Sequence, residues 1–165
     1  MRSRNWMDDN LATQGYCLVE SERRALGLGL RFSTGVCLAL TIGALIIGSP
    51  FVFVGLAVIG AAAGFGRRHP FDHIWNGAVR HAFDAPPLPL SPPRRRHAFK
   101  VATLMMLTIA ALFALGAATA ALVVGGLLVT ACTAVTATNL CLPSVALSFL
   151  DRRRVSAPDP AGANR

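Results

Sequence analysis

Charged residues are missing from two long stretches of this chain. No Asp, Glu, Lys or Arg occurs from Phe32 to Gly66, or from Val101 to Leu150. Only 15% of all residues are charged, whereas soluble domains carry about a quarter. Uncharged apolar stretches longer than about 18 residues are typical of transmembrane helices. The sequence therefore predicts an integral membrane protein rather than a soluble domain.

Several motifs of known chemistry are also missing. The chain has no glycine-rich phosphate loop after a strand and no nucleophile elbow. Its cysteines, at positions 17, 37, 132 and 141, show no paired spacing. The histidines are His69, His73, His81 and His97, and no cysteine pair accompanies them to favour a metal. We therefore expect no metal and no cofactor. The sequence leaves open whether the protein is an enzyme, and a non-enzymatic role is preferred.

Each apolar stretch is interrupted by residues that end helices. Gly48-Ser49-Pro50 divides the first, and Gly116 divides the second. We predict helices at about 30–48, 51–66, 99–116 and 119–140, guided by the roughly 20 residues that cross a bilayer. The fold class is then all-α, an integral membrane four-helix bundle made of two transmembrane hairpins. The first pair is short and needs tilt or local thinning, and a re-entrant hairpin is the alternative.

The basic residues flank the apolar stretches. The net charge is +8, but the arginines do not alternate with aromatic residues, so we do not expect nucleic-acid binding. An even number of spans with all Lys and Arg on one side predicts that both termini and the central loop are cytoplasmic. The predicted location is the inner (plasma) membrane, multi-pass, in contact with the lipid bilayer. Residues 1–25 form a cytoplasmic segment, 26–150 the transmembrane domain and 151–165 a disordered cytoplasmic tail.

The central loop carries an amphipathic pattern. In "PFDHIWNGAVRHAFD", residues 70–84, apolar side chains recur at three- and four-residue steps. We expect an interfacial helix that joins the two hairpins. Trp75 is its predicted anchor at headgroup level.

Cys141 and His69 are the candidate chemical groups. Pro143 interrupts the helix that precedes it, and a short helix restarting there would place Cys141 and Ser144 near its positive N-terminus. Cys141 is then either a space-filling residue at a kink or a reactive thiol at the cytoplasmic face. His69 either caps the helix that Pro70 begins, with Asp72 at its first turn, or stabilises a thiolate. The spacing does not show whether His69 and Cys141 meet.

These motifs resemble the bacterial domain-of-unknown-function family 4395 of small multi-span membrane proteins. The resemblance covers about Gly15 to Leu150. It rests on Arg31-Phe32, His69-Pro70-Phe71-Asp72 followed by Trp75-Asn76, Leu88-Pro89 with the prolines before Arg94, and Cys141-Leu142-Pro143-Ser144. Other members have a second cysteine where Ser144 stands, which argues against a dithiol redox role here.

The resemblance implies a membrane location and a shared site on one membrane face, but no reaction. The candidate residues of that site are Arg31, His69, Asp72, Asn76, Asn139, Cys141 and Ser144. The first functional hypothesis is a membrane scaffold or interaction module that docks a cytoplasmic protein partner. The alternative is a membrane-bound thiol or sulfur-handling protein that uses Cys141, with His69 or a nearby arginine stabilising the thiolate. The sequence does not reveal the oligomeric state.

Overall fold

Helices make up all the regular structure in the part of the chain that is described. In this computed structural model the described residues are 10–11, 14–16, 20–141, 143 and 145–146. The long helices are α2 (Glu20–Ile47), α3 (Pro50–Phe65), α6 (Pro93–Ala114) and α7 (Ala118–Thr138). Between α3 and α6 lies a continuous helical stretch of α4 (Pro70–Ile74), the π-helical turn η1 (Trp75–Val79) and α5 (Arg80–Ala82). The predicted all-α class is confirmed for these residues.

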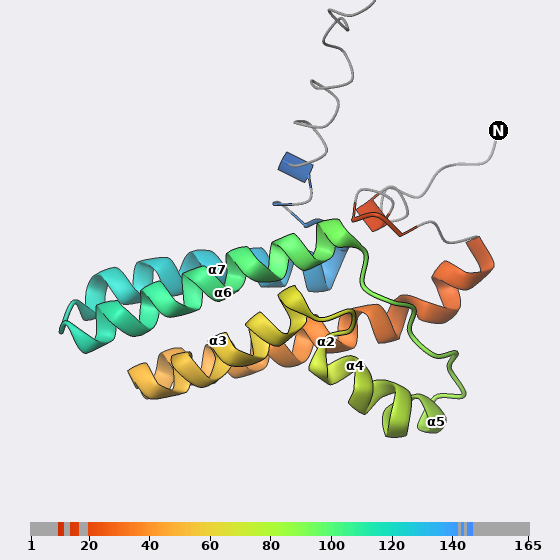
Figure 1. The fold of residues 1–165 in the computed structure, drawn as a ribbon, viewed down its shortest axis with the longest axis horizontal. Helices are drawn as coiled ribbons and strands as arrows, with labels where there is room; N and C mark the ends of the chain where they lie inside the picture. Colours follow the sequence, from red (N-terminus) through yellow and green to blue (C-terminus); the bar gives the residue numbers. More distant parts are fainter. Residues whose placement is uncertain (1–9, 12–13, 17–19, 142, 144, 147–165) are drawn as a thin grey trace, which may run out of the picture.

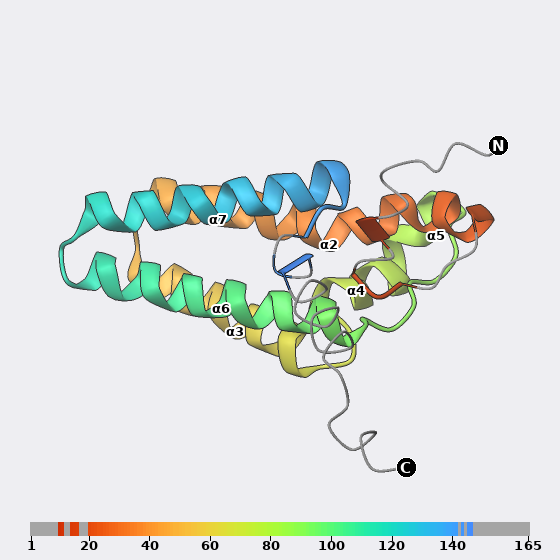
Figure 2. The same ribbon diagram turned by 90° about the horizontal axis from the view of Figure 1, so that it is seen from above.

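Two tight turns lie at the same end of the long helices (Figures 1 and 2). The first is at Gly48, whose φ of 66° is a left-handed conformation that glycine adopts without strain. Pro50 then begins α3, where its fixed φ suits the first helical position and its missing N–H is not needed. The second turn is at Gly116, with a φ of 75°. Because these signals are local in the sequence, both helix breaks were open to prediction.

The opposite end of the molecule carries the remaining connections. Pro93 begins α6 there, and α7 ends at Asn139, whose φ of 56° is left-handed. The Asn139 N–H donates to the Val135 carbonyl at 2.9 Å, which closes the last turn of α7. The end of α3 is held by Arg96, whose Nη2 donates to the Phe65 carbonyl at 2.9 Å. This end therefore carries hydrogen bonds that hold the ends of α3 and α7.

The main packing contacts join α3 to α6, α2 to α7, and α6 to α7. Small residues allow the backbones to approach, as lipid-embedded helices require. A Cβ placed on Gly60 would lie 2.7 Å from the Thr103 hydroxyl of α6, and one on Gly125 would lie 2.3 Å from a Leu45 methyl group of α2. The apolar core between these helices is built from Ala44, Phe53, Leu56, Ala57, Met106, Ile109, Ala110, Ala121 and Leu128.

Segments Leu26–Ile47, Pro93–Ala114 and Ala118–Thr138 are long and apolar enough to cross a membrane. Helix α3 alone is shorter, and passes the same test only together with Pro70–Ala82, from which it is bent by 77°. Large apolar side chains at the turn end face outward, among them Ile46, Phe51 and Leu115, each more than 80% exposed. Lipid contact explains such exposure where water would oppose it. These properties fit a membrane protein.

Trp75 differs from its sequence-based prediction. Its ring lies inside the protein, 1% exposed, and not at the outer surface where a headgroup anchor would lie. It packs against Phe32, with ring centroids 5.3 Å apart, and over Gly29, where a Cβ would come within 2.7 Å of the indole. The reason is Gly29, whose missing side chain leaves room on α2 for a large ring, and burial there removes the apolar area of the ring from water.

Candidate functional site

Buried polar side chains gather at the end of the molecule opposite the two tight turns. They come from four parts of the chain: α2, the start of α4, the first turn of α6, and the end of α7. The buried members are Ser33, Thr34, His69, Asp72, Arg95 and Asn139. Because buried polar groups are costly unless they are hydrogen-bonded, such a cluster must be held by specific partners.

His69 and Asp72 form a capping box at the start of α4. The His69 Nδ1 accepts from the Phe71 N–H at 3.2 Å, and the Asp72 Oδ2 accepts from the His69 N–H at 3.1 Å. The second oxygen of Asp72 accepts from the Ser33 hydroxyl of α2. The box therefore satisfies the helix N-terminus and ties it to α2.

The other ring nitrogen of His69, Nε2, contacts a cysteine. This cysteine is Cys37 and not Cys141, which the sequence analysis considered. The His69 Nε2 lies 3.5 Å from the Cys37 sulfur. Since Nδ1 is an acceptor, Nε2 carries the proton and donates it to the sulfur. Both ring nitrogens are thus occupied, and neither is left for Cys141. The predicted helix-capping role of His69 is present in the structure, and its thiol neighbour is Cys37.

Burial keeps this histidine neutral. Desolvation lowers the pKa of His69 to about 4, with the Arg95 charge acting in the same direction and the Asp72 carboxylate opposing it. An imidazolium would also lose the Nδ1 lone pair that accepts from the Phe71 N–H. At neutral pH the ring is therefore a structural group in its neutral form.

Arg95 is the buried cation of the cluster, with only 5% of its surface exposed. Its Nη1 donates to the Tyr16 hydroxyl, and its Nη2 donates to the Leu30 carbonyl at 3.3 Å. The guanidinium also lies 5.6 Å from the centre of the Phe99 ring. The hydrogen-bond acceptors described for this cation are thus neutral, and Asp72 attracts it only through space.

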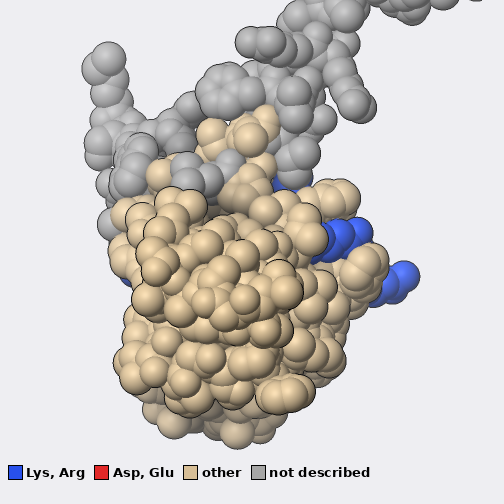
Figure 3. Space-filling model, turned by 90° about the vertical axis from the view of Figure 1, so that its left-hand side faces the viewer, with Lys and Arg blue, Asp and Glu red and all other residues tan. Residues whose placement is uncertain are grey.

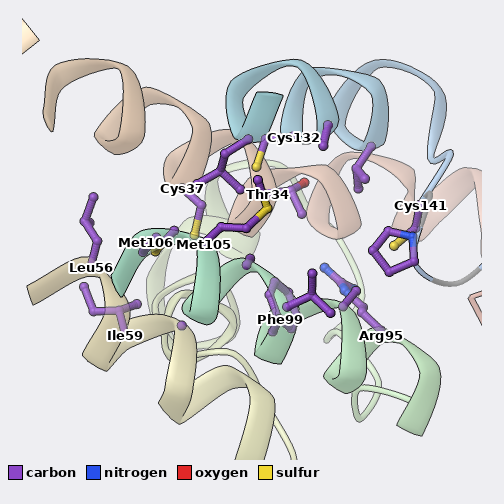
Figure 4. A pocket seen from close by; sticks show the side chains of 18 of the residues that line it. Thr34, Cys37, Leu56, Ile59, Arg95, Phe99, Met105, Met106, Cys132 and Cys141 are labelled. Carbon is purple, nitrogen blue, oxygen red and sulfur yellow. The ribbon is translucent and has the colours of Figure 1, made fainter. Parts of the chain in front are cut away.

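A pocket of about 110 Å³ lies between the helices beside Arg95. Figure 4 shows Arg95 and Cys141 at one end of this pocket and Leu56 and Ile59 at the other. Cys37 and Cys132 also line it, and these cysteines and Cys141 are free thiols. Cys141 is 4% exposed and lines the same pocket as Arg95. The structure thus places a thiol and a buried cation in one apolar enclosure.

Two side chains of the N-terminal segment bind the end of α7 beside the pocket. The Gln14 side chain lines the pocket and donates to the Asn139 carbonyl at 2.6 Å. The Asn10 amide donates to the Thr138 carbonyl at 2.9 Å. These bonds satisfy carbonyls at the end of α7 that have no partner within the helix.

The other predicted site residues lie in different surroundings. The Asn76 Oδ1 accepts from the Leu88 N–H at 2.7 Å, so this side chain holds the central loop. Arg31 is half-buried, and its carbonyl accepts from Thr34. Asn139 ends α7 beside the pocket. Ser144 lies outside the described residues, as does most of the short helix expected after Pro143.

Sequence reasoning missed Gln14, Tyr16, Ser33, Cys37 and Arg95 as members of the site. Arg95 belongs to a run of three arginines, and no sequence pattern distinguishes the inward member from its neighbours. Cys37 lies within an apolar stretch, where a cysteine usually only fills space. Within the described part of the chain, no three His, Cys, Asp or Glu side chains gather as metal ligands would.

Comparison with known proteins gives a family. A family model described as "Domain of unknown function (DUF4395)" matches residues 28–152. No curated protein and no solved structure matches the chain. The matched region includes α3, α6 and α7, most of α2, and both Arg95 and Cys141. Since this match covers most of its length, the chain belongs to the DUF4395 family of domains of unknown function.

Proposed function

We propose that this protein is a multi-pass protein of the inner (plasma) membrane, with a thiol site in a pocket at the cytoplasmic face. In this proposal α2, α3, α6 and α7 cross the bilayer as two hairpins, and both termini are cytoplasmic. The apolar outer surface of the helices supports the embedding. The short α3 spans with tilt or local thinning of the bilayer.

The distribution of charge supports the orientation. Figure 3 views the molecule from the end that carries the two tight turns. Among the described residues, charged side chains are missing from the middle of this face, and basic side chains appear only at its edge. The described arginines and Lys100 lie toward the opposite end, where α4, α5 and the start of α6 are. Basic segments are retained in the cytoplasm during membrane insertion, so the pocket end is the cytoplasmic one.

The observation that carries the thiol proposal is the placement of Cys141 with Arg95 in one buried pocket. The thiolate is the reactive form of cysteine, and a neighbouring cation favours it. Arg95 supplies that cation at the same end of the pocket as Cys141, and it makes its hydrogen bonds to neutral oxygens. His69, which the sequence offered as an activating group, contacts Cys37. In this proposal Arg95 is therefore the arginine that stabilises the Cys141 thiolate.

The proposed reaction is acceptance of sulfur from a small persulfide. The Cys141 thiolate attacks the outer sulfur of the donor, and a new sulfur–sulfur bond forms at Cys141. The donor's own sulfur–sulfur bond breaks, and its inner sulfur leaves as a thiolate. No external oxidant or reductant is needed, and the single thiol suffices. This fits a motif in which Ser144 stands in place of a second cysteine.

Mass spectrometry of the purified protein tests this reaction. After brief incubation with glutathione persulfide at pH 7, we expect the added sulfur on Cys141. The Arg95→Gln variant should accept at least fivefold less, because the cation that stabilises the thiolate is lost. Arg67→Gln is the matched control, since the Arg67 side chain is exposed and does not line the pocket. Equal labelling of Cys37, Cys132 and Cys141, or none at Cys141, contradicts the proposal.

A scaffold role is the second candidate, and an exposed apolar surface on the central helical stretch favours it. Ile74 is 52% exposed and Phe83 is 60% exposed, close to the basic Arg80 and His81. This surface suits either lipid headgroups or a cytoplasmic protein. A photo-crosslinking amino acid at position 74 distinguishes them in intact cells. Crosslinks to one defined protein support the scaffold role, and crosslinks to lipid alone contradict it for this surface.

A further inference from the structure

The pocket has a polar end and an apolar end, a division that the thiol proposal does not use. Figure 4 shows Arg95 beside Cys141, with Leu56 and Ile59 far from them along the pocket. The wall between the two ends is apolar and carries Phe99, Ala102, Met105, Met106 and Leu128. Methionine and aromatic side chains adapt to flexible apolar ligands. This shape suits a molecule with one charged group and a hydrocarbon body.

The cation at the polar end lacks a contacting anion among the described residues. Arg95 donates to the neutral oxygens of Tyr16 and Leu30. The nearby carboxylate of Asp72 already accepts from Ser33 and from the His69 N–H. A buried charge without a contacting counter-charge is costly, and an anion that reaches it forms strong charge-assisted hydrogen bonds.

The helix that carries Arg95 adds to this positive potential. Arg95 is in the first turn of α6, which begins at Pro93. The N-terminus of a helix has a partial positive charge and unpaired N–H groups, and both favour a negative group nearby. Arg95 lies within one turn of the positive end of α6, and both favour an anion close to the guanidinium.

The volume of the pocket bears on the length of the ligand. Val101 lines the pocket and is also exposed on the outside of α6. The cavity of about 110 Å³ is smaller than the roughly 150 Å³ that holds a benzene molecule in an engineered cavity. A short hydrocarbon chain of several carbons therefore fills the cavity.

We propose that this pocket binds a single-chain carboxylate amphiphile of the fatty-acid class. The carboxylate pairs with the Arg95 guanidinium, and the chain runs along Met105 and Met106 toward Leu56. The charge complementarity at Arg95 commits the site to an anionic head, and the continuous apolar wall commits it to a hydrocarbon tail. Binding does not require a reactive Cys141, so this inference stands or falls independently of the sulfur reaction.

Calorimetric titration of the full-length protein in a neutral maltoside detergent tests the inference. Octanoate is the probe, with 1-octanol and octylamine as ligands of similar length that lack the negative charge. We expect octanoate to bind at least tenfold more tightly than either. Arg95→Gln should weaken octanoate binding at least tenfold, while Arg67→Gln should leave it unchanged. Equal affinity for the three probes would overturn the proposal.

A second measurement on the unaltered chain covers the case in which Arg95→Gln does not fold. Bound octanoate should shield Cys141 and slow its alkylation by iodoacetamide at least threefold, whereas octylamine should not. Octanoate binding with no sulfur transfer to Cys141 leaves this inference standing and overturns the sulfur reaction alone. Sulfur transfer without selective octanoate binding does the reverse. Preferential binding of anionic phospholipid over octanoate also overturns the single-chain assignment.

Discussion

His69 has an unusual position for a histidine, since it acts as a buried helix cap. Its Nδ1 accepts a backbone N–H, its Nε2 contacts Cys37, and its own N–H donates to Asp72. The first of these contacts requires the neutral ring with its proton on Nε2, because Nδ1 needs a lone pair to accept. Protonation of the ring would remove an acceptor and bury a positive charge near Arg95, which the structure opposes.

Acidification should therefore destabilise the protein through His69. Because the folded pKa is lowered to about 4 from an unfolded value of about 6.5, the unfolded state binds more protons between these values. The stabilisation is fully present above about pH 6.5 and is lost as the pH falls toward 4, by roughly 3 kcal/mol at most. Thermal unfolding in neutral detergent from pH 7.5 to 4.5 measures this loss.

The matched variants for this measurement are His69→Asn and His73→Asn. Asparagine is a good N-cap residue that does not titrate, so His69→Asn should flatten the dependence of Tm on pH in this range. His73 lies on the same helix with an exposed side chain, and its replacement should leave the dependence as it is in the unaltered protein. A pH dependence that survives in His69→Asn contradicts this assignment.

Among the elements, the contact between α2 and the central helical stretch depends on one glycine. Gly29 faces the Trp75 indole and the Leu88 side chain at distances that leave no room for a Cβ. Gly27, two residues earlier on the same helix, has no atom within 4 Å of a Cβ placed there. Both positions are glycines of α2, but only Gly29 is packed against other side chains, so the two form a matched pair.

Replacing Gly29 with alanine should destabilise the protein by about 1–3 kcal/mol, because the added methyl group overpacks the Trp75 contact. Replacing Gly27 with alanine should leave stability unchanged or raise it by up to about 1 kcal/mol through helix propensity. The two Tm values, compared with that of the unaltered chain, check the prediction. Equal effects of the two substitutions would show that Trp75 does not pack on α2 as described.

The elements also show which parts of the structure were open to prediction. Helix breaks at Gly48-Ser49-Pro50 and Gly116 depend on backbone chemistry within a few residues, and the sequence reveals them. The inward position of Trp75 depends on Gly29, which is far away in the sequence. The His69–Cys37 contact likewise joins α2 to the start of α4. Amphipathic periodicity predicted an apolar face for Trp75 but could not decide between lipid and protein as its neighbour.

On the scale of the whole molecule, charge and turns lie at opposite ends (Figures 1 and 3). The proposed orientation predicts that positions in the turns at Ser49 and Gly116 face the outside of the cell. Single cysteines at these two positions, in a chain otherwise free of cysteine, should react with a membrane-impermeant maleimide in intact cells. A cysteine at Ala85, in the central loop, should react only after the cells are opened. Labelling of Ala85→Cys in intact cells would contradict the orientation.

Whole-molecule assembly also explains why the pocket was not predictable. Its lining comes from the N-terminal segment, all of the long helices, and the residues after α7. The sequence indicated a site with Cys141 near the cytoplasmic face, and the structure places Cys141 in a pocket at the end that carries the described basic residues. The sequence alone does not distinguish Arg95 from Arg94 and Arg96 as the inward residue. Which arginine faces the pocket depends on how α6 is rotated against its neighbours.

The hydrogen bonds from Asn10 and Gln14 to the carbonyls of Thr138 and Asn139 impose an order on biosynthesis. Asn10 and Gln14 are made more than 120 residues before the carbonyls that accept from them. In the proposed topology the hairpin of α2 and α3 enters the bilayer first, and Arg95 is enclosed only after α7, which supplies part of the pocket wall, has been made. A nascent chain stalled before residue 138 would therefore expose the Arg95 side chain to water and to quality-control proteases. In the completed chain Arg95 is buried.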